Sequence, residues 1–342
     1  MAPRTLESAH VSLVGYHDLE GRPGFKLAIQ EVDGRWLLYL AHLFHSGWSI
    51  VDVTDPASPD LVRFQPGPEN TTTKQIQVAD GKMITALERP KTDYGVVGGE
   101  RFDPAEPHKA GVAIWDLSDP TDPQLESEHL VGGRGTHRNF YPGGDYVYLC
   151  TSPEGLEPDM GEPTVNPVKN YYLSVLDISD PTEPVQVAEW MLPGQDPDDG
   201  VPAEPTYFHG PAYIQGDRAY LSYGREGMII LDVSDPTEPE LLSQLGFGPS
   251  LGSYNGTHSV VPIPGTDLAA VNSEAISEET PLERGGDPLQ YTFLVDVSDE
   301  RQPAFEGRTH RGPRVPSFST VQSSAIHGES SFSWLWMMSG EP

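Results

Sequence analysis

The sequence of 342 residues predicts an all-β fold built from five similar four-stranded units. Three observations lead to this prediction: one short segment recurs five times, a glycine-centred hairpin precedes each copy, and no stretch shows a convincing helical pattern of apolar residues. The copies are WSIVDVTDPASP, VAIWDLSDPTDP, LSVLDISDPTEP, MIILDVSDPTEP and TFLVDVSDERQP, at residues 48–59, 112–123, 173–184, 228–239 and 292–303. They follow one another 64, 61, 55 and 64 residues apart, counted between their shared aspartates Asp52, Asp116, Asp177, Asp232 and Asp296.

Each copy has the same local interpretation. Its β-branched apolar run predicts a short buried strand, and the segment after it, usually Ser/Thr-Asp-Pro, predicts a tight turn. The turn is expected because Asp, Ser and Thr side chains accept backbone N–H groups, while proline fixes φ. A further short strand follows each turn, and the hairpin before each copy bends at Gly34, Gly81, Gly144, Gly216 or Gly265. Four strands per unit, repeated radially, are the plan of a β-propeller.

The five copies resemble the LVIVD repeat, a motif that marks a family of β-propeller proteins. The repeats that carry this resemblance cover roughly residues 10–309. The resemblance implies a propeller fold and implies no particular reaction. We therefore expect one propeller domain over residues 1–309, with blades at about 20–66, 67–132, 133–195, 203–247 and 253–309.

The two ends of the sequence depart from the repeat. Residues 8–15 resemble an outer fourth strand, and we expect them to close the ring by completing the last blade. Residues 310–342 contain neither the Asp-Pro turn nor the apolar strand that precedes it. Two interpretations of this tail stay open: a truncated or degenerate sixth blade, or a loose tail behind a five-bladed ring.

The composition disfavours several classes of protein. With 51 acidic and 21 basic residues the formal net charge is −30, which argues against binding to nucleic acid. No apolar run reaches the roughly 18 residues that a membrane span requires. The single cysteine, Cys150, excludes an internal disulfide and a cysteine-based zinc site. Because the sequence has no recognisable secretory signal, we expect a cytoplasmic protein.

The acidic charge also suggests a halophilic source. Lysine occurs only six times in the sequence. A dispersed acidic surface with few lysines suits molar salt, because salt screens the mutual repulsion of the carboxylates. Ordinary acidity and calcium binding are the alternatives, although turn capping is the expected role of the aspartates in the repeated Asp-Pro turns.

Histidines recur at one point of the repeat and are the main functional signal. The positions seven residues before the hairpin glycines are Leu27, Lys74, His137, His209 and His258. Propeller symmetry would bring the three imidazoles together near the central axis, where a three-histidine set can hold Fe, Cu or Zn. His17, before the first hairpin, is a candidate fourth ligand, and His42 and His45 are weaker candidates.

Charged side chains are expected at the same face as the histidines. Glu88 and Glu274 each end the second strand of their blade, so they are candidates to orient a histidine or to act as a general base. Long connections follow both, at about 89–110 and 274–290, and a third spans 152–170. Arg138 and Arg225 are candidates to clamp an anionic ligand, or to pair with structural carboxylates.

Two functions from different classes follow from these observations. In the first, the protein is a metal-dependent enzyme that oxidises or hydrolyses a small molecule at the loop face. In the second, it is a non-catalytic propeller whose loop face binds a protein or another ligand, and the histidines only line a polar channel. Stoichiometric metal that is lost on mutation of the histidines would favour the first.

Overall fold

The computed structural model of the protein describes residues 12–42, 45–89, 106–152, 171–196, 200, 208–224, 226–246, 255–274 and 292–306. These residues form strands and turns, with one 3-10 helix, η1 (Leu19–Gly21). No helix in the described ranges is long and apolar enough to cross a membrane. The all-β class predicted from the sequence is confirmed.

The strands form five antiparallel sheets, one for each repeat, which we call blades 1 to 5. Blade 1 contains β1 (Gly24–Val32), β2 (Arg35–His42), β3 (Gly47–Asp52) and β4 (Asp60–Pro66). Blade 2 contains β5 (Ile76–Ala79), β6 (Lys82–Leu87), β7 (Gly111–Asp116) and β8 (Gln124–Leu130). Blade 3 contains β9 (Tyr146–Thr151), β10 (Tyr172–Asp177) and β11 (Val185–Trp190). Blade 4 contains β12 (Tyr213–Gln215), β13 (Arg218–Tyr223), β14 (Gly227–Asp232) and β15 (Glu240–Leu245). Blade 5 contains β16 (Asn255–Pro262), β17 (Leu268–Glu274), β18 (Thr292–Asp296) and β19 (Ala304–Phe305).

Blade 3 has three strands instead of the predicted four because its inner segment is irregular. Residues 136–140 pair with β9 only through isolated bridges at their two ends. Between these bridges, the side chain of Asn139 accepts the N–H of Cys150 at 3.2 Å and donates to the hydroxyl of Thr136 at 2.8 Å. A side-chain amide therefore takes the place of a backbone partner, and no continuous ladder forms.

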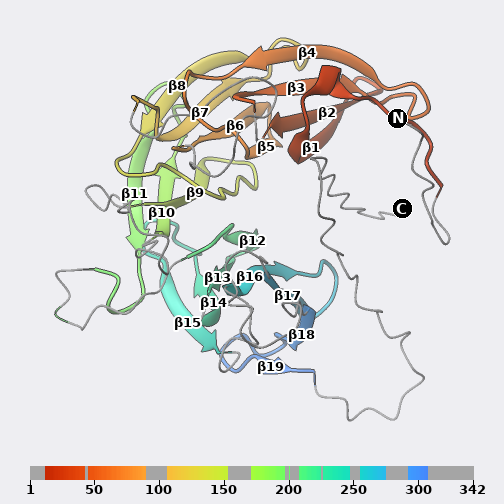
Figure 1. The fold of residues 1–342 in the computed structure, drawn as a ribbon. Coiled ribbons are helices and arrows are strands. Elements are labelled where there is room, and N and C mark those ends of the chain that lie inside the picture. The colour runs from red at the N-terminus through yellow and green to blue at the C-terminus, as the bar shows by residue number, and fades with distance from the viewer. Residues whose placement is uncertain are drawn as a thin grey trace, which may run out of the picture.

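The five blades follow one another in chain order around a common centre, and the four-stranded blades have their first strand innermost (Figure 1). An apolar cluster lies between each pair of consecutive blades. Between blades 1 and 2, for example, Tyr39 and Trp48 pack in one cluster with Ile76 and Met83. Corresponding clusters join blades 2 and 3, 3 and 4, and 4 and 5. Face-to-face packing of the sheets thus holds the blades in place.

The repeated turns have the capping that the sequence predicts. In blade 1, Asp52 accepts the N–H of Thr54 at 2.9 Å, and Asp55 accepts the N–H of Ala57 at 3.0 Å. The corresponding two aspartates of every other blade cap the chain in the same way. The five hairpin glycines all have left-handed φ values, from 58° to 77°, which glycine adopts without strain. The sequence repeat is therefore also a structural repeat.

The fourth position of the outer strand ties a blade to the turn of the next blade. The hydroxyl of Ser127 in β8 donates to the carbonyl of Pro181 at 2.5 Å, and that of Ser243 in β15 donates to the carbonyl of Glu300 at 2.6 Å. At the same position in blade 1, Arg63 forms an ion pair with Asp122. These contacts add polar links between blades to the apolar clusters.

The ring is not closed by the residues that the structure describes. Leu294 of β18 is 38 % exposed. The residues at the same place in the other four blades are all fully buried: Ile50, Ile114, Val175 and Ile230. Ile29 and Trp36 on blade 1 are also exposed, by 51 % and 45 %. Blade 5 and blade 1 each have a sheet face without a described neighbour.

The predicted closing strand at residues 8–15 is wrong for its described part. Residues 12–15 form no strand, and Leu13 and Val14 are exposed. The backbone of Gly15 lies so close to Pro56 that a Cβ atom there would overlap the Pro56 carbonyl oxygen. The segment therefore lies against the first Asp-Pro turn and not in a sheet. Residues 8–11 and the tail 310–342, with its two interpretations, lie outside the described residues.

We expect Ser127→Ala and Ser243→Ala each to lower the free energy of unfolding by about 0.5–1.5 kcal/mol, because each removes one hydrogen bond between blades. Urea unfolding monitored by tryptophan fluorescence measures the change. Ser58→Ala, at an exposed turn position, is the matched control and should change stability by less than about 0.5 kcal/mol. Equal effects at all three positions would contradict a role for these hydroxyls in joining blades.

Candidate functional site

The candidate site, which we call the inner cluster, lies where the inner ends of blades 2 to 5 meet. It consists of side chains from these four blades: Lys74, Glu88, His137, Arg138, Tyr171, His209 and His258. Four of the five positions in the predicted seven-residue register belong to it. The register therefore identifies positions that meet in space.

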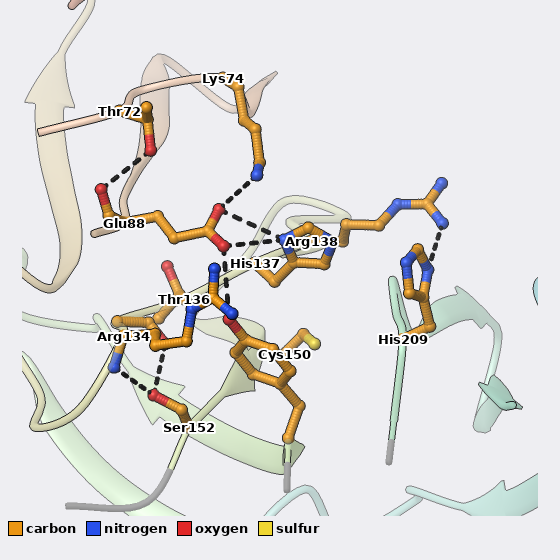
Figure 2. A network of polar contacts seen from close by, with 12 residues as sticks. Thr72, Lys74, Glu88, Arg134, Thr136, His137, Arg138, Cys150, Ser152 and His209 are labelled. Carbon is orange, nitrogen blue, oxygen red and sulfur yellow. Dashed lines mark hydrogen bonds and ion pairs between the residues drawn. The ribbon is translucent and has the colours of Figure 1, made fainter. Parts of the chain in front are cut away.

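Glu88 is the buried anion of the inner cluster. Its side chain is 1 % exposed, and the Lys74 Nζ atom lies 2.7 Å from its Oε2 atom (Figure 2). The Nδ1 atom of His137 is 3.1 Å from Oε1 of the same carboxylate. Tyr171 donates its hydroxyl to Oε1 at 3.3 Å and stacks on the His137 ring, with centroids 5.6 Å apart. A buried carboxylate requires such partners, since desolvation alone strongly disfavours its charge.

These partners keep Glu88 ionised. Burial on its own would raise the pKa of Glu88, but the Lys74 ammonium, His137 and Arg134 together hold that pKa well below its usual range. Burial raises the pKa of the Tyr171 hydroxyl well above its usual value, and the neighbouring Glu88 charge adds to this effect. The inner cluster therefore contains a carboxylate that accepts hydrogen bonds and a phenol that donates one.

Backbone contacts fix Glu88 within blade 2 and against blade 3. Its N–H and carbonyl groups pair with those of Thr72, and the Thr72 hydroxyl also donates to the Glu88 carbonyl at 2.9 Å. An isolated bridge joins Glu88 to Gly135, two residues before His137. Gly135 has a φ of +87°, and a Cβ atom there would overlap the Leu87 carbonyl oxygen. Glycine at this position lets the two blades approach closely enough for the carboxylate to meet the imidazole.

The three predicted histidines lie in a row across blades 3, 4 and 5. The ring centroids of His137 and His209 are 5.0 Å apart, and those of His209 and His258 are 4.3 Å apart. The backbone N–H of His137 donates to the Cys150 carbonyl, and that of His209 donates to the Ser222 carbonyl. The imidazoles of His137 and His209 are thus attached to segments that are fixed on a neighbouring strand.

Arg138 reaches into the same row of rings. Its Nη1 atom is 3.1 Å from Nδ1 of His209 (Figure 2). The same Nη1 atom donates to the His258 carbonyl at 3.0 Å. The same atom donates to the Ser259 hydroxyl at 3.1 Å, and that hydroxyl lies 3.0 Å from Nδ1 of His258. Because arginine can only donate, Nδ1 of His209 is the acceptor and carries no proton. The guanidinium links blade 3 to blades 4 and 5.

The described residues do not form a ready-made metal centre. Within the described ranges, no group of three or more His, Cys, Asp or Glu side chains is arranged to hold an ion. Two imidazole nitrogens already have partners. Nδ1 of His137 faces Glu88, and Nδ1 of His209 faces Arg138. The rings are close together, but the guanidinium of Arg138 contacts ring nitrogens of both His209 and His258.

The remaining predicted residues have different outcomes. The Nδ1 atom of His17 accepts the N–H of Leu19 at 2.9 Å, and no described contact joins His17 to the other three histidines. Glu274 ends β17 as predicted, but its side chain lies outside the described part of the chain, as does the whole of Arg225. His42 uses both ring nitrogens within blade 1, on Pro23 and Ser49.

Sequence reasoning missed Tyr171. This residue follows a long connection and directly precedes β10, and nothing in the repeat distinguishes it. Its place beside Glu88 and His137 depends on contacts between blades 2 and 3, which spacing along the sequence does not reveal.

We expect Glu88→Gln to lower the free energy of unfolding by about 3–5 kcal/mol, because it leaves the buried Lys74 ammonium without its counter-charge. Urea unfolding at neutral pH measures the change. The matched control is Glu128→Gln, which breaks a more exposed pair with Lys109 and should cost no more than about 1 kcal/mol. A similar small cost for both variants would show that the Lys74–Glu88 pair is not important for stability.

We expect His42 to make stability depend on pH below neutrality. Burial lowers the pKa of His42 to about 4, below the value of about 6.5 in an unfolded chain, and the nearby His45 and Arg22 add to this effect. Its contribution is therefore complete above about pH 6.5 and is lost as pH falls through about 4. In urea unfolding between pH 7 and 4.5, His42→Gln should lose less stability than the unmodified protein. Parallel pH profiles would contradict this.

Comparison with known proteins agrees with the fold. The LVIVD repeat model matches residues 168–191 and 213–245, in blades 3 and 4. No significant match occurs among curated proteins.

A solved protein from Lactobacillus plantarum is similar over 83 % of this chain and 70 % of its own, with 12 % identity and a TM-score of 0.52. A hypothetical selenium-binding protein from Sulfolobus tokodaii is similar over 84 % of this chain and 67 % of its own, with 10 % identity and a TM-score of 0.53. At this identity the two structures show a shared fold alone. With LVIVD repeats matched in blades 3 and 4 and with its radial blades, this chain has a fold of the β-propeller type.

Proposed function

We propose that this protein is a metal-dependent enzyme that oxidises or hydrolyses a small molecule at the loop face, with His137, His209 and His258 as ligands of Fe, Cu or Zn. The main support is that three successive blades bring three imidazoles into contact. Imidazole is a ligand that these three metals share. An ion held here would supply a Lewis acid or a redox centre.

The spacing within each neighbouring pair of rings is compatible with an ion shared by that pair. With metal–nitrogen bonds of about 2.0–2.1 Å, neighbouring imidazole centroids would lie roughly 4.5–5.5 Å apart. The His137–His209 separation of 5.0 Å lies within this range, and the His209–His258 separation of 4.3 Å lies slightly below it. The guanidinium of Arg138 competes for Nδ1 of His209, so an ion would use this nitrogen only when Arg138 turns away.

Glu88 has the role of orienting His137 in this proposal. The ionised carboxylate accepts the proton of Nδ1, which leaves Nε2 of His137 for a ligand or for a proton of the substrate. Tyr171 stacks on the same ring and donates to the same carboxylate, so it restrains both groups. Glu274 stays a candidate general base.

A second candidate is a non-catalytic binding propeller, and the position of Arg138 favours it. The guanidinium donates to His209, to the His258 carbonyl and to Ser259. In this case the histidines are partners of an arginine that joins three blades, and the loop face binds a ligand without a reaction.

Metal content distinguishes the two functions. We expect untagged protein, incubated in turn with Fe(II), Cu(II) or Zn(II) and then dialysed, to retain one ion per chain of its preferred metal. His137→Ala, His209→Ala and His258→Ala should each lose it, because each removes a ligand. Elemental analysis gives the stoichiometry.

Two variants make this experiment specific. His129→Asn, on the outer strand β8, is the matched control and should retain the metal. Arg138→Gln should retain or gain affinity, because it removes the group that competes for His209. If the unmodified protein and Arg138→Gln both lack stoichiometric metal, the metal-dependent function is rejected and the binding propeller is supported.

A further inference from the structure

Blades 1 and 5 are the two ends of the row of blades, and both expose apolar side chains (Figure 1). On blade 1, Ile29 and Trp36 are 51 % and 45 % exposed. Ile76 and Met83 have the same positions relative to the hairpin glycine of blade 2, and both are fully buried against blade 1. On blade 5, Leu294 is 38 % exposed. Neither of these two faces has a neighbouring sheet among the described residues.

The exposed side chains belong to apolar rows that run across strands. On blade 1, Ile29 of β1 is the cross-strand partner of Leu38 of β2. On blade 5, Ala270 of β17 pairs with Val261 of β16 on one side and with Leu294 of β18 on the other. Cross-strand partners lie on the same face of a sheet, so each row is a continuous apolar surface. Exposed surfaces of this kind mark places where another element packs.

The sequence after blade 5 contains an apolar segment that matches such surfaces. Residues 332–338 read FSWLWMM, so six of these seven residues are apolar. In an extended chain, alternate residues point to opposite sides, which puts Trp334 and Trp336 on one side and Leu335 and Met337 on the other. Apolar residues on both sides are typical of a strand buried between two layers.

Charge favours this segment over a second copy of the chain as the occupant of the two faces. Residues 310–342 contain two arginines and two glutamates, so their formal charge is zero and the charge of −30 belongs to residues 1–309. A second copy would bring the same negative charge towards the first, and the two would repel each other. A neutral segment meets no such repulsion.

Connectivity favours the same segment. The last described strand, β19, ends at Phe305, and residue 332 follows after about 27 residues, which can extend to roughly 90 Å at most. This reach includes the faces of both blade 5 and blade 1. Because the segment is covalently attached, its packing is intramolecular and does not depend on protein concentration.

We propose that residues 332–338 pack between the exposed faces of blades 5 and 1, with one side of the segment on each face. The segment takes the place of the neighbouring blade that both faces lack. It covers Leu294 on blade 5 and Ile29 on blade 1. The proposal is independent of the proposed function, since it involves no residue of the inner cluster and its tests require no metal.

Cysteine cross-linking in the full chain tests this packing. Leu294→Cys and Ile29→Cys are each combined with Leu335→Cys or Trp336→Cys and treated with a short bis-maleimide. The native Cys150 is fully buried and should not react. Because positions 335 and 336 point to opposite sides, we expect Leu294→Cys to cross-link within the chain to one of them and Ile29→Cys to the other. Each favoured pair should react at least about tenfold faster than the alternative pair, because packing holds its thiols together.

Leu241→Cys is the matched control for these pairs. Leu241 is 49 % exposed on the outer strand of blade 4, away from both faces. Combined with either tail cysteine, it should react as slowly as the alternative pairs. Equal rates for all pairs would overturn the proposal, because a segment without a fixed place meets every exposed thiol. Products that join two chains would show that a second copy covers the faces, and would overturn it as well.

A second measurement decides the case in which the double cysteine variants do not fold. Leu294→Cys alone is labelled with a water-soluble maleimide, and the rate is compared with that of the same variant carrying Trp334→Ser and Met337→Ser. Loss of apolar side chains from both sides should speed labelling at least about fivefold, because it releases the segment from the face. Phe318→Ser, in the tail but outside residues 332–338, should leave the rate unchanged. The same rate in all three proteins would contradict the proposed packing.

Discussion

Both faces of the sheets in this protein are apolar, so each blade is stable only between two neighbours. This requirement explains the repeat: the short strand before each Asp-Pro turn is buried from both sides in blades 1 to 4. It also explains why the faces of blades 5 and 1 that have no neighbour among the described residues stand out, with Leu294 and Ile29 exposed. At roughly 25 cal/mol for each Å² of apolar surface, uncovered faces of this kind are costly. The arrangement of every other group follows from this packing.

Face-to-face packing brings the inner strands together, and that is where polar groups become unavoidable. Backbone and side chains from several blades meet at short distances, so charges there must be paired. The Lys74–Glu88 pair and the His137 imidazole satisfy this need within blades 2 and 3. Arg138 does so across blades 3, 4 and 5 through His209 and the His258 carbonyl. Structural and chemical roles are therefore combined in the same residues, and a loss of stability is expected to accompany some losses of function.

Much of the fold could be predicted from the sequence because its determinants are local. The Asp-Pro turns need only an aspartate two residues before the N–H that it caps, and the hairpins need only a glycine with left-handed φ. The histidine register followed from the same regular spacing. Other features depend on contacts between distant residues and could not be predicted: the Asn139 amide that replaces a ladder bond, the contact of Gly15 with Pro56, and Tyr171 beside Glu88. The contacts of Arg138 with His209 and His258 also depend on distant residues.

The face that carries the Asp-Pro turns is acidic for a reason that lies in the repeat itself. Every Asp-Pro turn uses two aspartates as caps, so five turns place ten carboxylates on the face away from the inner cluster. The inner cluster lies at the opposite ends of the strands, where the charges are buried in the Lys74–Glu88 pair or hydrogen-bonded, as in Arg138. Salt screens the exposed carboxylates more effectively than it screens half-buried cations, because water and ions reach the former freely. Molar salt would therefore weaken the mutual repulsion of these ten carboxylates while it leaves the buried Lys74–Glu88 pair nearly unchanged.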